Sequence, residues 1–144
     1  MYAADIASTH LLVGIKLEAV IRTEHDWNCQ NPEQRKVWAS AIGEALSAIE
    51  GKWKIIIICQ LFAAHGPLRF SELERRVEGV NQKMLIQQLK ELEKDGIVTR
   101  TAYPEVPPKV EYNLSELGKA LGPAMEALID WALQRNSDAT GAGR

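Results

Sequence analysis

Apolar residues recur every three or four positions along most of this chain, and that spacing predicts a mainly helical protein. The stretch 3–24 carries one such stripe and the stretch 33–49 carries another. A polar segment separates them, and Asn31 before Pro32 is typical of a helix start. We therefore predict two amphipathic helices in the N-terminal third of the chain.

The segment "KWKIIIICQLFAAHG" (52–66) is continuously apolar in its middle and admits two interpretations. Four consecutive isoleucines favour a strand by propensity, whereas the unbroken length from Trp53 to Ala64 favours a buried helix. Because Gly66 and Pro67 then provide a clear stop, we predict the helix. Cys59, within it, is predicted to be a buried and inert thiol.

A short helix and a longer one follow, separated by the tight turn "EGVN". Ser71, with Glu74 three residues later, has the pattern of a capping box and predicts a short helix over 72–77. Asn81 is suited to cap the longer helix, which ends at Gly96. The order of these elements is typical of a helix-turn-helix.

The longer helix has two contrasting faces on a helical wheel. Three leucines, Leu85, Leu89 and Leu92, stack on one side. The opposite side gathers lysine and glutamine with no carboxylate among them, namely Lys83, Gln87, Lys90 and Lys94. We therefore expect the leucine face to be buried in the core and the cationic face to contact the partner.

After this helix, the apolar and polar residues follow the pattern of strands rather than that of helices. Segments 97–102 and 109–114 read as two strands, and the prolines of the loop 103–108 suit an exposed projection. Ser115 is placed to cap a further helix to about residue 135, interrupted only at Gly122 and Pro123.

These elements predict a mainly α fold with a small β-wing, a winged helix-turn-helix with extra N-terminal helices. The divisions we expect are a helical extension over 1–50, the winged core over 51–114, a C-terminal helix over 115–135 and a frayed tail over 136–144. In this architecture the second helix of the turn motif lies in the DNA major groove.

Composition narrows the function by exclusion. The net charge is -2, so a basic surface must be a local patch, and the first 50 residues are more acidic than the rest. Two cysteines suit a reducing cytosol and are too few for a disulfide framework or a zinc site. No catalytic motif, metal site or membrane span is predicted. The three histidines lie in unrelated stretches of the sequence and form no recognisable motif. We expect no enzyme and no cofactor.

The residues also resemble the HxlR family of bacterial winged-helix regulators. The similarity runs from about Gly51 to Trp131, through "GKWKIIII", "GPLRFSELERRVEGVNQKMLIQQLKELEKDGIV", "VPPKVEY" and "LSELGKAL". The resemblance implies a cytoplasmic, nucleoid-associated transcription factor. It also implies a homodimer built by the first and last helices, with repression as the commoner output.

Two departures from the family pattern matter. Many members carry a cysteine followed by proline about eleven residues before the glycine of "GKW", where this chain has Ser40 and Ala41. Redox sensing through that residue is therefore not available, and Cys29 is the remaining candidate for a reactive thiol. Ile86 stands where a threonine is usual, which puts one DNA contact in doubt.

Candidate DNA-binding residues follow from the architecture. Lys83 and Gln87 lie early in the second helix, where base edges are reached, with Gln82 and Asn81 nearby. Arg69, Arg100 and Lys109 are suited to phosphates. Lys90 fits a DNA contact and a merely solubilising role equally well. Arg75 and Arg76 fit either phosphates or pairing with Glu72 or Glu78.

Two functions remain open at this point. The first is a sequence-specific regulator, with a small-molecule inducer as a variant. The pocket for the inducer would involve Trp38 and Trp131, although tryptophans at such positions more often belong to a dimer core. The second is a winged-helix module that binds a protein or ligand and has lost DNA contact. Salt-dependent DNA binding distinguishes them.

Overall fold

The structure is a computed structural model that describes residues 30–141, with side chains to residue 138. The chain divides into two units, Met1–Ile49 and Glu50–Arg144, each described by itself. The predicted helix over 3–24 and the candidate thiol Cys29 lie outside the described residues.

The described part of the first unit is helix α3, Pro32–Ile49, which confirms the predicted helix over 33–49. The side chain of Asn31 accepts a hydrogen bond from the Glu33 N–H at 3.0 Å, which satisfies one of the free amides at the helix start. Ile42 and Leu46 are half exposed on this helix.

The second unit begins with helix α4, Lys52–Ala64, so the helical interpretation of the isoleucine-rich segment is confirmed. The helix ends at His65, which itself adopts the left-handed conformation, with φ 53°. Ile57, Ile58 and Leu61 are buried, whereas Cys59 is exposed. The prediction of a buried Cys59 is wrong, because a residue two positions after Ile57 points to the opposite side of an α-helix.

The helix-turn-helix consists of α5, Phe70–Arg76, and α6, Gln82–Lys94. The Asn81 side chain caps α6 by accepting from the Met84 N–H at 2.7 Å, as predicted. The prediction of Ser71 as the cap of the short helix is wrong. Helix α5 starts at Phe70, two residues earlier than predicted, and the Glu72 carboxylate accepts from the Arg69 N–H at 3.2 Å.

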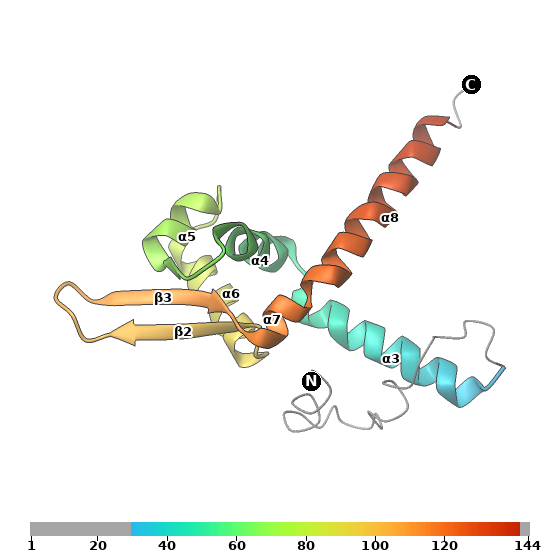
Figure 1. The fold of residues 1–144 in the computed structure, drawn as a ribbon, viewed down its shortest axis with the longest axis horizontal. Helices are drawn as coiled ribbons and strands as arrows, with labels where there is room; N and C mark the ends of the chain where they lie inside the picture. The colour runs from blue at the N-terminus through green and yellow to red at the C-terminus, as the bar shows by residue number, and fades with distance from the viewer. Residues whose placement is uncertain (1–29, 142–144) are drawn as a thin grey trace. The chain divides into compact units, whose positions relative to one another are not determined.

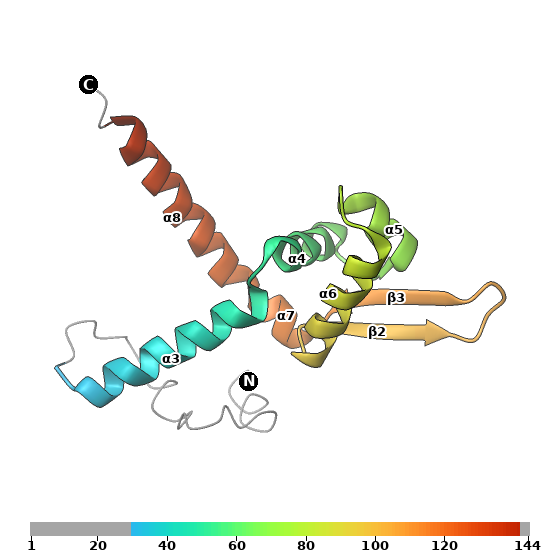
Figure 2. The same cartoon turned by 180° about the vertical axis from the view of Figure 1, so that it is seen from behind.

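The wing is the hairpin of β2, Val98–Tyr103, and β3, Lys109–Leu114, and it confirms the two predicted strands within one residue. A two-residue strand β1, Leu68–Arg69, adds to it in the order β1-β3-β2, all antiparallel. A strand this short has too few positions to show alternation, so the sequence did not indicate it. Figures 1 and 2 show α6 beside this sheet.

The core of the second unit lies between the sheet and helices α4, α5 and α6. Leu85, Leu89 and Leu92 of α6 are fully buried there, as the wheel predicts. Leu61 and Leu73 are buried too, whereas Trp53 and Phe62, which the sequence also assigns to the core, are only partly buried. Since the leucine face of α6 is wholly packed, its lysine and glutamine face is left outward.

Two C-terminal helices follow the wing, α7, Glu116–Ala120, and α8, Gly122–Gly141. The Ser115 hydroxyl caps α7 by accepting from the Gly118 N–H at 3.0 Å. The frayed tail predicted from residue 136 is wrong for 136–141, because α8 continues through them. The stretch 124–140 contains neither proline nor glycine to stop the helix.

Candidate nucleic-acid interface

The outward face of α6 is polar and cationic along its length. Lys83, Gln87, Lys90 and Lys94 are all exposed, on the side opposite the buried leucines. Glu93 lies on the flank of this face, and Glu91 is turned toward α4. Helix α6 therefore presents donors and positive charge at the surface, as a helix that enters a major groove must.

An ion pair fixes α6 on α4. The Lys54 ammonium, on a residue only 8% exposed, lies 2.8 Å from the Glu91 carboxylate. Gln87 donates to the other oxygen of Glu91 at 3.4 Å. The hydrogen bond from Lys54, with that from Gln87, lowers the pKa of Glu91 below its ordinary value. The pair thus sets the position of α6 and orients one of its candidate base-reading side chains.

Replacing Glu91 with glutamine is expected to destabilise the fold at neutral pH more than at acid pH. The lowered pKa means that ionised Glu91 favours the folded state above its ordinary pKa of about 4.5. That contribution is lost as pH falls through the lower folded-state value. Urea unfolding of both proteins at pH 7 and pH 3 measures the gap, with Glu93→Gln as control. A gap that does not shrink at pH 3 would contradict this role.

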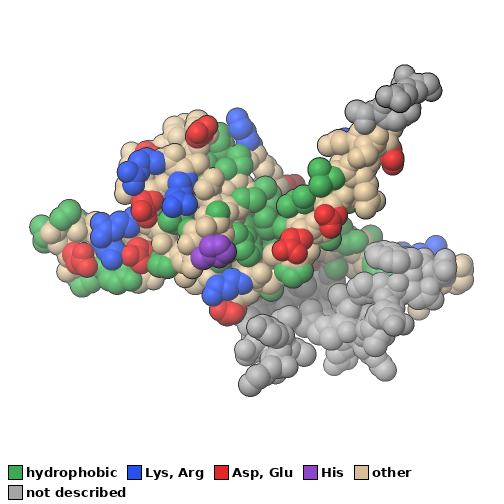
Figure 3. Space-filling model, turned by 45° about the horizontal axis from the view of Figure 1, so that its top comes forward, with side chains coloured by type: hydrophobic (Ala, Val, Ile, Leu, Met, Phe, Trp, Pro, Cys, Tyr) green, Lys and Arg blue, Asp and Glu red, His purple; other side chains and the backbone are tan. Residues whose placement is uncertain are grey.

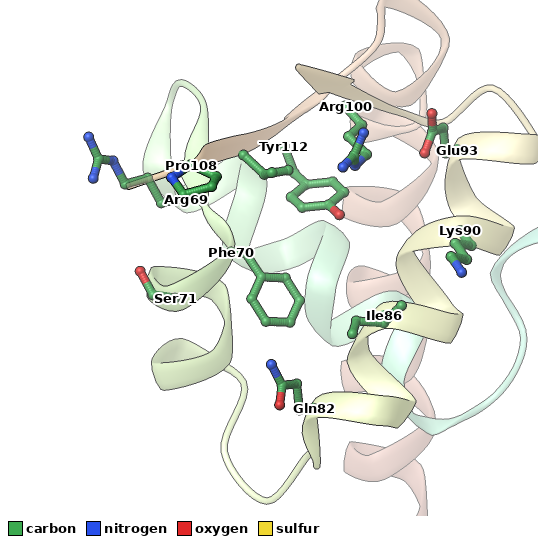
Figure 4. A pocket seen from close by; sticks show the side chains of 11 residues that line it. Arg69, Phe70, Ser71, Gln82, Ile86, Lys90, Glu93, Arg100, Pro108 and Tyr112 are labelled. Carbon is green, nitrogen blue, oxygen red and sulfur yellow. The ribbon is translucent and has the colours of Figure 1, made fainter. Parts of the chain in front are cut away.

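A groove of about 640 Å³ runs between α6, the start of α5 and the wing. Its floor is apolar and its rim is charged. Figure 4 shows Ile86 and Phe70 facing each other across its middle, with Tyr112 beyond them. The rings of Phe70 and Tyr112 lie 6.4 Å apart, centroid to centroid. The complete lining is Arg69, Phe70, Ser71, Gln82, Ile86, Lys90, Glu93, Arg100, Pro108, Val110 and Tyr112.

Four predicted DNA-binding residues line this groove, although they come from three parts of the sequence. Arg69 ends β1, Gln82 and Lys90 belong to α6, and Arg100 lies on β2 opposite Tyr112 of β3. Lys83 and Gln87 do not line the groove, and occupy the neighbouring row of α6. The predicted residues of α6 therefore fall on two adjoining rows, with Gln82 and Lys90 along the groove and Lys83 and Gln87 beside it.

Lys109 is in a different situation from the other predicted cations. Its ammonium lies 2.9 Å from the Glu111 carboxylate and 4.7 Å from the centre of the Tyr103 ring. The hydrogen bond to Glu111 raises the pKa of Lys109, and the Tyr103 hydroxyl donates to Glu111 at 3.3 Å. Its charge is already balanced, so the wing offers Arg100 to a phosphate more readily than Lys109.

The remaining candidates divide between structure and surface. The Asn81 carbonyl oxygen is engaged as the α6 cap.

Figure 3 shows Lys and Arg side chains interspersed with Asp and Glu over the face of the molecule that is in view, so any basic surface on that face is local. Within residues 30–141, no group of acidic, His or Cys side chains is arranged to hold a metal ion. No helix in that range is long and apolar enough to span a bilayer.

Sequence reasoning missed the apolar floor of the groove. Phe70, Val110 and Tyr112 come from different elements, and each reads as an ordinary core residue. Ile86 gave the only signal, as an isoleucine on the exposed side of an amphipathic helix where the family pattern has threonine.

The fold and the site define a class: a winged helix-turn-helix protein with the polar face of its second helix exposed beside a wing. Comparison with known proteins agrees. The model of the HxlR-like helix-turn-helix family matches residues 48–139, so the chain belongs to the HxlR family. It is therefore a DNA-binding transcriptional regulator rather than an enzyme.

Three relatives illustrate the match. The uncharacterized HTH-type transcriptional regulator YtcD of Bacillus subtilis is 46% identical over 98 residues, covering 68% of this chain and 76% of YtcD. A structure of a MarR-family transcriptional regulator from Enterococcus faecalis superimposes with a TM-score of 0.65 at 39% identity, covering 71% and 91%. The redox regulator HypR in its reduced form gives 0.62 at 40% identity, covering 71% and 98%.

Proposed function

We propose that this protein is a homodimeric regulator that places one α6 from each copy in successive major grooves of a two-fold symmetric DNA site. The observation that carries the proposal is the outward face of α6, where Lys83 and Gln87 are exposed next to a groove rimmed by Arg69 and Arg100. In family members of this architecture, occupying an operator most often represses transcription, and we propose the same output here.

The polar residues divide by role. Gln87 offers the paired donor and acceptor that adenine requires, and Lys83 offers donors for guanine oxygen and nitrogen. Arg69 and Arg100 lie at the groove rim, where the sugar-phosphate backbone would pass, and guanidinium groups suit phosphate. Lys90 also lines the groove and serves the same backbone role. The first pair would specify sequence and the others would supply affinity.

A selection experiment tests this proposal. The protein is incubated with a random duplex pool at near-physiological salt, and bound sequences are recovered and titrated. We expect a two-fold site with half-sites about 34–36 Å apart, or a multiple of that spacing, and affinity that falls steeply with salt. No enrichment and no salt-dependent binding would overturn the proposal and favour a winged-helix module for another partner.

The dimer rests on the surface of α8. Leu128 is 45% exposed, Ile129 56% and Trp131 58%, an apolar surface that a monomer would leave in water. A second copy would cover this face, and the two-fold symmetry that results matches a palindromic site. The segment 1–50, which we predict to be a helical extension, would add to the interface. A small-molecule inducer and a role of Cys29 in sensing remain predictions.

Trp131→Glu is expected to convert the dimer to a monomer, because a charged side chain would be buried in an apolar interface. Light scattering would then give about 16 kDa instead of twice that mass. Glu126→Gln, on the same helix, serves as control and should remain dimeric. A wild-type protein that is monomeric at micromolar concentration would contradict the dimer.

A further inference from the structure

Ile86 is an apolar side chain on the partner side of α6. It is 36% exposed, whereas the helix's three buried leucines are fully enclosed, so it is not needed to fill the core. It lies one turn from Gln82 in one direction and one turn from Lys90 in the other, on the row that lines the groove. An exposed isoleucine between two polar residues of this row indicates an apolar contact with the partner.

The groove supplies the rest of an apolar subsite around Ile86. Phe70 faces it across the groove, and Tyr112 and Pro108 continue the wall toward the wing (Figure 4). Val110 also lines the groove. The tilted packing of Phe70 on Tyr112, at 53° between ring planes, gives this wall a defined surface. The walls come from α5, α6 and β3, so the subsite exists only when the winged helix is folded.

The charge at the rim indicates what the groove receives. Arg69, Lys90 and Arg100 are cations and Glu93 is the only carboxylate among the lining residues. An apolar floor between cations suits a ligand with an anionic backbone and an apolar group at its centre. Duplex DNA has both, since the thymine C5-methyl is the apolar group that its unmodified bases present in the major groove.

We propose that Ile86, with the Phe70 wall, receives the C5-methyl of a thymine in the bound site, which makes Ile86 a specificity-determining residue. This inference rests on the proposed function and adds to it the base that this row of α6 reads. It gives the two rows of α6 separate roles. Lys83 and Gln87 read base edges by hydrogen bonds, and Ile86 reads a methyl by contact.

The test removes the thymine methyl from the DNA and the apolar side chain of Ile86 from the protein. Each thymine of the selected half-site is replaced singly by deoxyuridine, which lacks only the C5-methyl, and affinity is measured for wild type and Ile86→Ala. At one position, wild type should lose about fourfold, the worth of one buried methyl-sized group. Ile86→Ala should lose less than twofold there, because the partner surface has been removed. Circular dichroism confirms that the variant is folded.

A control and a second variant make the result specific. Val106→Ala removes an apolar side chain that is fully exposed at the wing tip and does not line the groove. It should respond to deoxyuridine as wild type does. Ile86→Thr keeps a β-branched shape and one methyl but replaces the ethyl arm with a hydroxyl, and its preference for thymine at that position should be weaker than that of wild type.

The outcomes separate this inference from the proposed function. If the protein selects a two-fold site but wild type and Ile86→Ala respond alike to every deoxyuridine, the regulator stands and the thymine contact falls. The groove would then take another occupant, such as a small anion that carries an apolar group. If no DNA is bound under any condition, the proposed function itself has failed.

Discussion

Gly118→Ala is expected to lower the free energy of unfolding by about 3 kcal/mol, as overpacking at a rigid contact does. A Cβ at this position would lie 2.2 Å from the Ile97 carbonyl oxygen, too close for any real contact. The obstacle is backbone, so no side-chain rotation relieves it. The Ser115 N–H also donates to that carbonyl at 3.0 Å, and the Ser115 hydroxyl donates to the neighbouring Gly96 carbonyl, which together hold the peptide in place.

The substitution should also disturb the packing of α7 on the wing, because the Ile97 carbonyl is where helix α7 meets the root of the wing. Urea unfolding measures the loss, and Gly66→Ala is the matched control, since no atom lies within 4 Å of its added Cβ. That control should change stability by less than about 0.5 kcal/mol. Equal stability for wild type and Gly118→Ala would show that α7 can move away from the wing at no cost.

Replacing both Lys83 and Gln87 with alanine is expected to lower affinity for the selected site by about 100-fold, with little change for unrelated sequences. A well-formed contact to a base edge contributes about 1–3 kcal/mol of discrimination, and two such contacts would be lost. Both residues lie on the exposed side of α6, so the fold should be retained. Titration of matched and scrambled duplexes at fixed salt measures the two affinities.

Two controls distinguish base reading from simple loss of charge. Lys94→Ala removes an exposed lysine at the far end of the same helix and should leave the preference intact. Arg100→Ala should weaken all sequences alike and reduce the steepness of the salt dependence, as loss of a phosphate contact does. If the double variant keeps its preference for the selected site, the assignment of Lys83 and Gln87 to base edges is wrong.

The local elements of this protein could be predicted because their signals are short-range. The helical period of the leucines predicted which face of α6 would be buried, and Asn81 marked its start. The strands of the wing followed from composition and from the proline-rich loop between them. Caps and strand composition act over a few residues, so one sequence is enough to show them.

Errors occurred where packing, not local pattern, set the outcome. Cys59 has apolar neighbours in the sequence yet is exposed, because its burial depends on what lies opposite that side of α4. Strand β1 exists only because β3 pairs with Leu68 and Arg69. Helix α5 starts at Phe70 rather than at the predicted Glu72, because the Glu72 side chain reaches the Arg69 amide.

The sequence alone determined the class of protein, through the order of its elements, its family motifs and the lysine and glutamine face of α6. Only the tertiary structure decided which cations are available: Lys109 is paired with Glu111, and Arg69 and Arg100 meet at one groove. It alone showed that groove's apolar floor, where Ile86, Phe70 and Tyr112 come together. Contacts between residues distant in the chain depend on how the elements pack, which the local periodicity of a sequence does not encode.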